Sequence, residues 1–166
     1  MRKILFLVIA VVFGLIVCLG ACGSPISTYI KQDVASMNES VKDKIFEVTV
    51  NGATVVEGMQ INYMTTLPKE DGIKYTIINV TFKNIDDESR YIGEGDLIIN
   101  DNEKIYKFDN SETIMADGWG LFLDQLSPLA SVTTNIVYRI PKKIQGDAYY
   151  IPGRGEAKFY LGKIGN

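Results

Sequence analysis

The chain has 166 residues, 46% of them hydrophobic, and a formal net charge of −3 from 17 basic and 20 acidic side chains, with no histidine. Without histidine, Ser-His-Asp and Cys-His catalysis and most zinc or copper sites are excluded. The acidic balance also argues against a nucleic-acid partner, because contact with phosphates requires a net basic face.

The first 21 residues have the pattern of a secretory signal peptide. Arg2 and Lys3 give a positive start, residues 4–19 form an apolar run without a charge, and Leu19-Gly20-Ala21-Cys22 follows. A positive start, an apolar core and small residues before a cut site are the parts of such a signal. The last four residues resemble the bacterial lipobox, in which the cysteine thiol receives a lipid with acyl chains such as palmitate. The resemblance implies cleavage just before Cys22 and a membrane anchor on that residue.

An uncleaved transmembrane anchor is the alternative, since the apolar run approaches the roughly 17 residues that a spanning helix needs. The lipobox-like residues count against it, as does the absence of a Lys or Arg cluster directly after Cys22. Either anchor places the remainder at the extracytoplasmic face of the membrane. Cys18 and Cys22 are the two cysteines of the chain. Cleavage and lipidation would therefore leave neither a free thiol nor a disulfide.

Residues 22–43 are predicted to form a lipidated stem or linker. Ile26, Ile30, Val34, Met37 and Val41 recur every three or four residues, with polar residues between them. This spacing is typical of an amphipathic helix. A flexible, extended tether accounts for the same composition, so the stem is predicted to be helical in part or not at all.

Residues 44–166 are predicted to form an all-β domain, because apolar and polar residues alternate and turn signals recur. Asn51-Gly52 is read as a turn between two strands. Residues 74–84 give the clearest strand, rich in β-branched and aromatic residues. Other strands are predicted at 45–50, 55–63, 91–92, 97–99, 104–108, 131–140, 149–151 and 158–164. This pattern of short strands indicates one immunoglobulin-like antiparallel β-sandwich.

Three stretches in this domain resemble a known family. They are Tyr75–Asn84, Asp96–Tyr106 and Val137–Pro141, in that order. They are similar to the immunoglobulin-like (telokin-like) lipoprotein domain of unknown function of low-GC Gram-positive bacteria, itself distantly similar to the mycobacterial immunoprotective extracellular antigen. Asn102-Glu103 departs from the family, which often has a glycine in that hairpin. The resemblance implies a sandwich fold and a Gram-positive cell-surface location, and it implies neither catalytic residues nor a cofactor.

Four residues are candidates for binding. Trp119 lies between two glycines in a polar loop, where it is either an interface anchor or a plug that closes one end of the sandwich. Tyr149 and Tyr150, near Arg154, form either a platform for carbohydrate or peptide, or a pair with one ring in the core and one outside. No metal ligand is assigned, although the acidic turns at 86–88 and 100–103 carry oxygen atoms of the kind that calcium binds.

The leading functional hypothesis is a membrane-tethered, non-enzymatic module that binds a surface protein or another envelope ligand, without a cofactor. One alternative is a phage-exclusion or bacteriocin-immunity lipoprotein that blocks an incoming protein by contact. Another is a carboxylate-dependent hydrolase, which needs two acidic side chains within about 5–10 Å of each other across a cleft.

The lipobox assignment predicts that the protein isolated from its own membrane carries lipid on Cys22, and that the Cys22→Ala protein carries none. Intact-mass spectrometry measures both. An unlipidated wild type, or a lipidated Cys22→Ala protein, would contradict the assignment.

Overall fold

The computed structural model describes residues 34–121, 125–153 and 155–165, which form strands and connecting loops without a helix. No segment of this described part is therefore a helix long and apolar enough to cross a membrane. The strands are β1 (Val34–Ala35), β2 (Ser40–Asp43), β3 (Phe46–Val56), β4 (Met59–Gln60), β5 (Thr66–Leu67), β6 (Ile73–Asn84), β7 (Arg90–Tyr91), β8 (Gly93–Asp101), β9 (Lys104–Phe108), β10 (Gln125–Leu126), β11 (Ser131–Pro141), β12 (Gly146–Gly153) and β13 (Lys158–Ile164).

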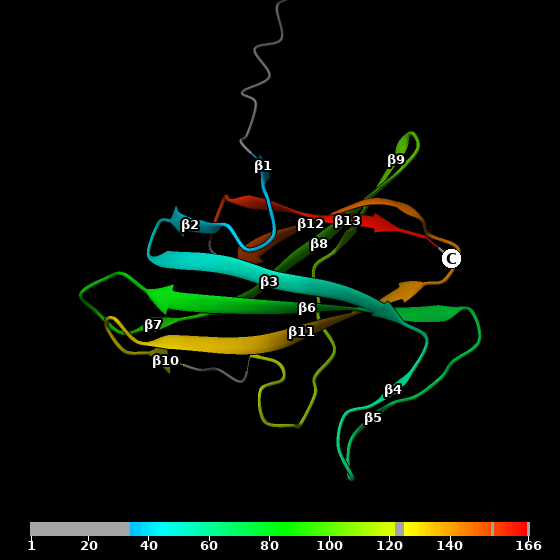
Figure 1. Ribbon diagram of the computed structural model, residues 1–166, viewed down its shortest axis with the longest axis horizontal. Coiled ribbons are helices and arrows are strands. Elements are labelled where there is room, and N and C mark those ends of the chain that lie inside the picture. The colour runs from blue at the N-terminus through cyan, green and yellow to red at the C-terminus, as the bar shows by residue number, and fades with distance from the viewer. Residues whose placement is uncertain (1–33, 122–124, 154, 166) are drawn as a thin grey trace, which may run out of the picture. The chain divides into compact units, whose positions relative to one another are not determined.

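Two sheets make up the domain (Figure 1). One has the strand order β1-β13-β12-β8-β9 and the other β11-β6-β3-β2, while β10 with β7 and β4 with β5 form short two-stranded ladders. All of these strand pairs are antiparallel except the short β1–β13 pair. The predicted all-β antiparallel sandwich is confirmed.

The main core lies between the two sheets. Alternate residues of β6 point into it, and Ile78, Val80 and Phe82 are fully buried there. The opposing sheet contributes Leu97 and Tyr150, among others. Because successive side chains on a strand point to opposite faces, each sheet supplies one apolar layer to this core.

The predicted turn at Asn51-Gly52 is wrong, since β3 runs through it as one strand. The pairing with β6 shifts by one residue there: Val50 pairs with Val80 and Gly52 with Asn79, so Asn51 is an extra, bulged residue. Its side-chain amide donates to Asn79 Oδ1 and Thr81 Oγ1, both at 2.9 Å. The long partner β6 holds the chain extended, and the local turn preference is absorbed as a β-bulge.

The end of the predicted stem also belongs to the sandwich. Val34–Ala35 pairs with β13, and Ser40–Asp43 pairs with β3 at the edge of the four-stranded sheet. The helical spacing therefore does not produce a helix in residues 34–43, where pairing with existing strands prevails. Asn38 makes the turn between them, with a left-handed φ of 67° and a hydrogen bond from its N–H to Val50 O at 2.8 Å. Residues 1–33, including Cys22, lie outside the described residues.

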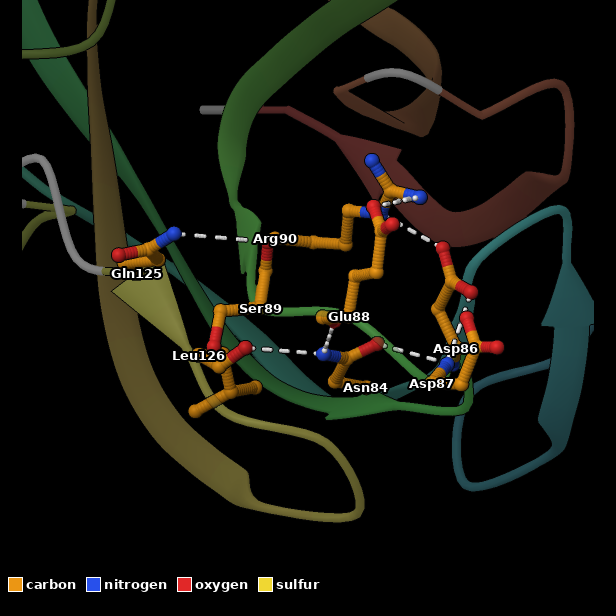
Figure 2. A network of polar contacts seen from close by, with 8 residues as sticks. All are labelled: Asn84, Asp86, Asp87, Glu88, Ser89, Arg90, Gln125 and Leu126. Atoms are coloured by element: carbon orange, nitrogen blue, oxygen red, sulfur yellow. Dashed lines mark hydrogen bonds and ion pairs between the residues drawn. The ribbon is translucent and has the colours of Figure 1, made fainter.

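The Asn84 side chain joins the loop after β6 to β10 through hydrogen bonds (Figure 2). Its side chain is fully buried, and its Nδ2 donates to Glu88 O at 2.7 Å and to Leu126 O at 2.8 Å. Its Oδ1 accepts the N–H of Asp86 at 2.9 Å. One amide thus satisfies backbone groups from two separate segments, as buried polar groups require.

We predict that Asn84→Ala lowers the free energy of unfolding by about 2–3 kcal/mol, because three hydrogen bonds of a buried side chain are lost. Urea denaturation measures the change. Asn110→Ala is the matched control: this exposed amide contacts the neighbouring Asp109 side chain, so its change should stay within about 0.5 kcal/mol. Equal effects of the two substitutions would contradict the role of Asn84.

Candidate functional site

A second apolar cluster lies on the outer face of the four-stranded sheet. Its buried members are Leu67, Tyr75, Ile77, Ile114 and Val137. The side chains of β6 and β11 are therefore packed on both faces of this sheet. The cover on the outer side comes from the β4–β5 hairpin and from the loop after β9, which extend together beyond the sheet in Figure 1.

Trp119 lies in this loop and is held against the sheet. It forms an isolated parallel bridge with Asn135 of β11: the N–H of Gly120 donates to Asn135 O at 2.8 Å, and the N–H of Asn135 donates to Gly118 O at 3.0 Å. Gly118 and Gly120 both have φ of 74°, a conformation that favours glycine. The two glycines let the loop turn onto β11 and fix the backbone of Trp119.

A row of side-chain amides anchors the same loop. Asn51 on β3 donates to Asn79 Oδ1 on β6, and Asn79 Nδ2 donates to Asn135 Oδ1 on β11, each at 2.9 Å. Asn135 Nδ2 in turn donates to Gly118 O at 3.1 Å. This row links three adjacent strands to the Trp119 loop. The backbone that carries Trp119 is therefore fixed to β3, β6 and β11.

The Trp119 side chain is half-buried against the second cluster, and three large apolar side chains of the two segments that cover this cluster are exposed. Tyr63, Met64 and Met115 have 86%, 77% and 80% of their surface accessible. Thr65 Oγ1 donates to Met115 O at 3.3 Å, which joins the β4–β5 hairpin to the loop. A pocket of about 540 Å³ lies beside the indole, with Val132 of β11 in its wall. We call Tyr63, Met64, Met115 and Trp119, which the two covering segments carry, the Trp119 surface.

The observed position of Trp119 contradicts one of the two sequence interpretations, the plug, while the interface anchor stays a prediction. The residue packs on the outside of one sheet and does not plug an end of the sandwich, while Leu121 packs against the main core. Phe122 lies outside the described residues. Sequence reasoning missed Tyr63, Met64 and Met115. The available signal was the presence of large apolar side chains inside polar loop segments.

Tyr150 is wrong as a surface binding residue, because it is fully buried and its hydroxyl donates to Glu94 O at 2.7 Å. Tyr149 faces outward on the same strand. Its ring lies 5.3 Å from that of Tyr160, with Lys158 Nζ 4.0 Å from its centroid. One ring of the predicted pair thus lies in the core and the other outside, as the second sequence interpretation states, and the Tyr149 ring contacts that of Tyr160. Arg154 lies outside the described residues.

The acidic turn after β6 already has a cationic partner. Arg90 Nε lies 2.6 Å from Asp86 Oδ2, and its Nη2 lies 3.0 Å from Glu88 Oε2 (Figure 2). Hydrogen bonding by this guanidinium lowers the pKa of Asp86. Within the described residues, no three Asp, Glu, Cys or His side chains are grouped as a metal site.

A family model matches residues 35–156, most of the chain. The chain belongs to DUF4352, a domain of unknown function. The match begins at the second residue of β1, which agrees with a sandwich that starts before residue 44.

Solved structures share the fold of this DUF4352 chain. A conserved hypothetical protein from Bacillus anthracis is 20% identical, with a TM-score of 0.56 over 76% of this chain and 94% of that one. An uncharacterized β-sandwich protein from Clostridium difficile 630 is 12% identical, with a TM-score of 0.52 over 79% and 96%. The yjhA protein from Bacillus subtilis is 25% identical over 72% and 83%, with a TM-score of 0.49. No curated protein matches the chain significantly.

We predict that Asn135→Ala loosens the Trp119 loop, because it removes the amide that joins Gly118 to the row of asparagines. The fluorescence of Trp119, the one tryptophan of the chain, should shift to the red and be quenched more strongly by acrylamide. The free energy of unfolding should fall by about 1–2 kcal/mol. Ser40→Ala on β2, which removes an exposed hydroxyl bonded to Glu47 Oε1 at 3.1 Å, is the control and should leave the emission unchanged. Unaltered emission in Asn135→Ala would contradict the anchoring.

Proposed function

We propose that this DUF4352 protein is a lipoprotein tethered through Cys22 to the extracytoplasmic face of the membrane, where it acts as a non-enzymatic binding module. Its partner is a protein of the cell envelope, which docks on the Trp119 surface. The observation that carries the proposal is the exposure of Tyr63, Met64 and Met115 on the two joined segments that cover the outer face of the sheet, one of which also holds the half-buried Trp119. The finer resemblance to telokin-like domains and the mycobacterial antigen stays a prediction.

The composition of the Trp119 surface supports a protein partner. Aromatic residues and methionine are enriched in protein interfaces, and tryptophan and tyrosine are frequent among the residues that dominate binding energy. Methionine adapts its shape to different contacts because its side chain is unbranched and flexible. Several large apolar side chains gathered at one place on a surface mark an interaction site more often than scattered ones do.

The arrangement of the domain also supports a protein partner. In Figure 1, β1 lies on one side of the sandwich, and the β4–β5 hairpin extends on the opposite side. A tether would join the domain at Val34, on the side opposite to the hairpin. This separation within the domain favours contact of the Trp119 surface with another envelope protein over contact with the bilayer that holds the anchor.

Two chemical features support a role without catalysis. The chain contains no histidine. A carboxylate hydrolase also needs one carboxyl group with a raised pKa to donate a proton. In the described part of the chain, every carboxyl group with a clearly shifted pKa has it lowered by a partner. These groups are Glu57 beside Lys142, Glu70 beside Arg139, Asp86 beside Arg90 and Glu156 beside Lys44.

Site-specific cross-linking in the producing cell tests the docking surface. We predict that a photoreactive amino acid at position 63 or 115 of the full chain yields an adduct with one envelope protein. Ile105 and Leu129 are both 74% exposed and serve as matched control positions, which should yield no such adduct. The same adduct from all four positions, or none from positions 63 and 115, would contradict the proposal.

Affinity for the cross-linked protein supplies a second test. The double variant Tyr63→Ser/Met64→Ser should bind it roughly 30-fold more weakly, the effect of losing about 2 kcal/mol at a binding hot spot. The unfolding midpoint should not fall, since both side chains are exposed in the free protein. Ile105→Ser should leave binding unchanged. Equal affinities of the double variant and the wild type would exclude these two side chains from the interface.

A further inference from the structure

The Asn51-Gly52 pair at the bulge of β3 is a chemically reactive sequence. It is the one asparagine-glycine pair of the chain. The side-chain amide of an asparagine can be attacked by the backbone nitrogen of the next residue. Glycine favours this attack because it has no side chain to block the approach and its backbone is the least restricted. Among the asparagines of the chain, the sequence therefore makes Asn51 the one that loses its amide most readily.

The structure leaves space for this reaction. Asn51 is exposed, and as the extra residue of the bulge it has no partner opposite it on β6. Among the described residues, and apart from the two chain neighbours of Gly52, no atom lies within 4 Å of the position that a Cβ on Gly52 would take. A five-membered ring that joins Asn51 to Gly52 therefore meets no obstacle on that side.

We propose that Asn51 is a site of spontaneous deamidation, and that the product loosens the Trp119 loop. The Gly52 nitrogen gives its proton to water and forms a bond to Asn51 Cγ. The Cγ–Nδ2 bond breaks, and the amide nitrogen takes up one proton and leaves as ammonia. Water then adds to one of the two carbonyl carbons of the cyclic imide and opens the ring. Position 51 becomes aspartate or isoaspartate, and neither step needs an oxidant or a reductant.

Either product breaks the first link in the row of asparagines. Asn51 Nδ2 donates to Asn79 Oδ1 at 2.9 Å, whereas a carboxylate has no proton to donate. Its oxygen would face the acceptor oxygen of Asn79 and repel it. Asn79 Nδ2 donates to Asn135 Oδ1, and Asn135 Nδ2 donates to Gly118 O. A displaced Asn79 side chain therefore disturbs the backbone that carries Trp119.

Peptide mapping by mass spectrometry tests the chemistry. The purified full-length protein is kept folded in lipid nanodiscs at mildly alkaline pH, and the conversion of each asparagine is followed with time. Position 51 should convert faster than Asn110, an exposed asparagine that precedes a serine. Gly52→Ala should slow the conversion roughly tenfold, which corresponds to about 1.4 kcal/mol in the barrier. The added methyl group fits, because Gly52 has no positive φ and open space beside it.

Trp119 fluorescence tests the consequence for the loop. Asn51→Asp imitates one product and should shift the emission to the red and increase quenching by acrylamide. Asn110→Asp is the matched control, since it makes the same change of charge at an exposed asparagine outside the row, and its emission should equal that of the wild type. During incubation, the wild-type emission should change in proportion to the conversion at position 51, while that of Gly52→Ala should change far more slowly.

Two results would overturn the proposal. One is an unmodified Asn51 in the folded protein after a time in which the isolated peptide of residues 45–57 has converted completely. This result would show that the sheet and the hydrogen bonds of the amide protect the pair. The other is an unchanged Trp119 emission in both Asn51→Asp and the converted wild type, which would show that the product does not affect the loop.

Discussion

The structure depends on the burial of β6 on both faces. This strand pairs along its length with β3 on one side and β11 on the other. One face sends Ile78, Val80 and Phe82 into the main core, and the other sends Tyr75 and Ile77 into the second cluster. A shift of one residue in its register would exchange the two sets. The packing of both sheet faces therefore fixes the register of β6 against β3 and β11.

The Trp119 surface follows from this pattern, and the two ends of β6 differ in what they bury. On the outer face, the apolar half of β6 is covered by the β4–β5 hairpin and the Trp119 loop, whose own apolar residues then remain partly exposed. On the inner face, the apolar run stops at Ile78, and Thr76 and Lys74 take the last two positions. A strand that is buried throughout thus presents an apolar surface outside and unpartnered polar groups inside.

The sequence predicts the long strands β6 and β11 well, because their alternation is strong, whereas β3 was predicted as two strands, at 45–50 and 55–63. The strand predicted at residues 74–84 is observed as Ile73–Asn84, and that at 131–140 as Ser131–Pro141. The bulge at Asn51 was missed, because a local Asn-Gly signal cannot reveal that a long partner strand holds the chain extended. The strands at Val34–Ala35 and Ser40–Asp43 were missed for a related reason. Their pairing partners lie far along the chain or across a turn, and spacing alone favours a helix.

The candidate sites were less predictable than the strands. The row of asparagines could not be predicted, because it forms only when β3, β6 and β11 lie side by side. The burial of Lys74 could not be predicted either, because a lysine at the start of a strand is normally exposed. One signal was present: the second face of β6 has Tyr75 and Ile77 at one end and Thr81 and Lys83 at the other. A face that is apolar over half its length predicts a local cover over that half.

The most direct test of the account is to measure whether Trp119 contacts lipid in the anchored protein. The single tryptophan permits a fluorescence measurement on the full-length wild type in bilayers that contain quencher-labelled lipids. The account predicts no quenching by these lipids, because it proposes that the Trp119 surface contacts a protein partner and not the bilayer. Strong quenching by the lipids would show that this surface lies on the bilayer and would contradict the account.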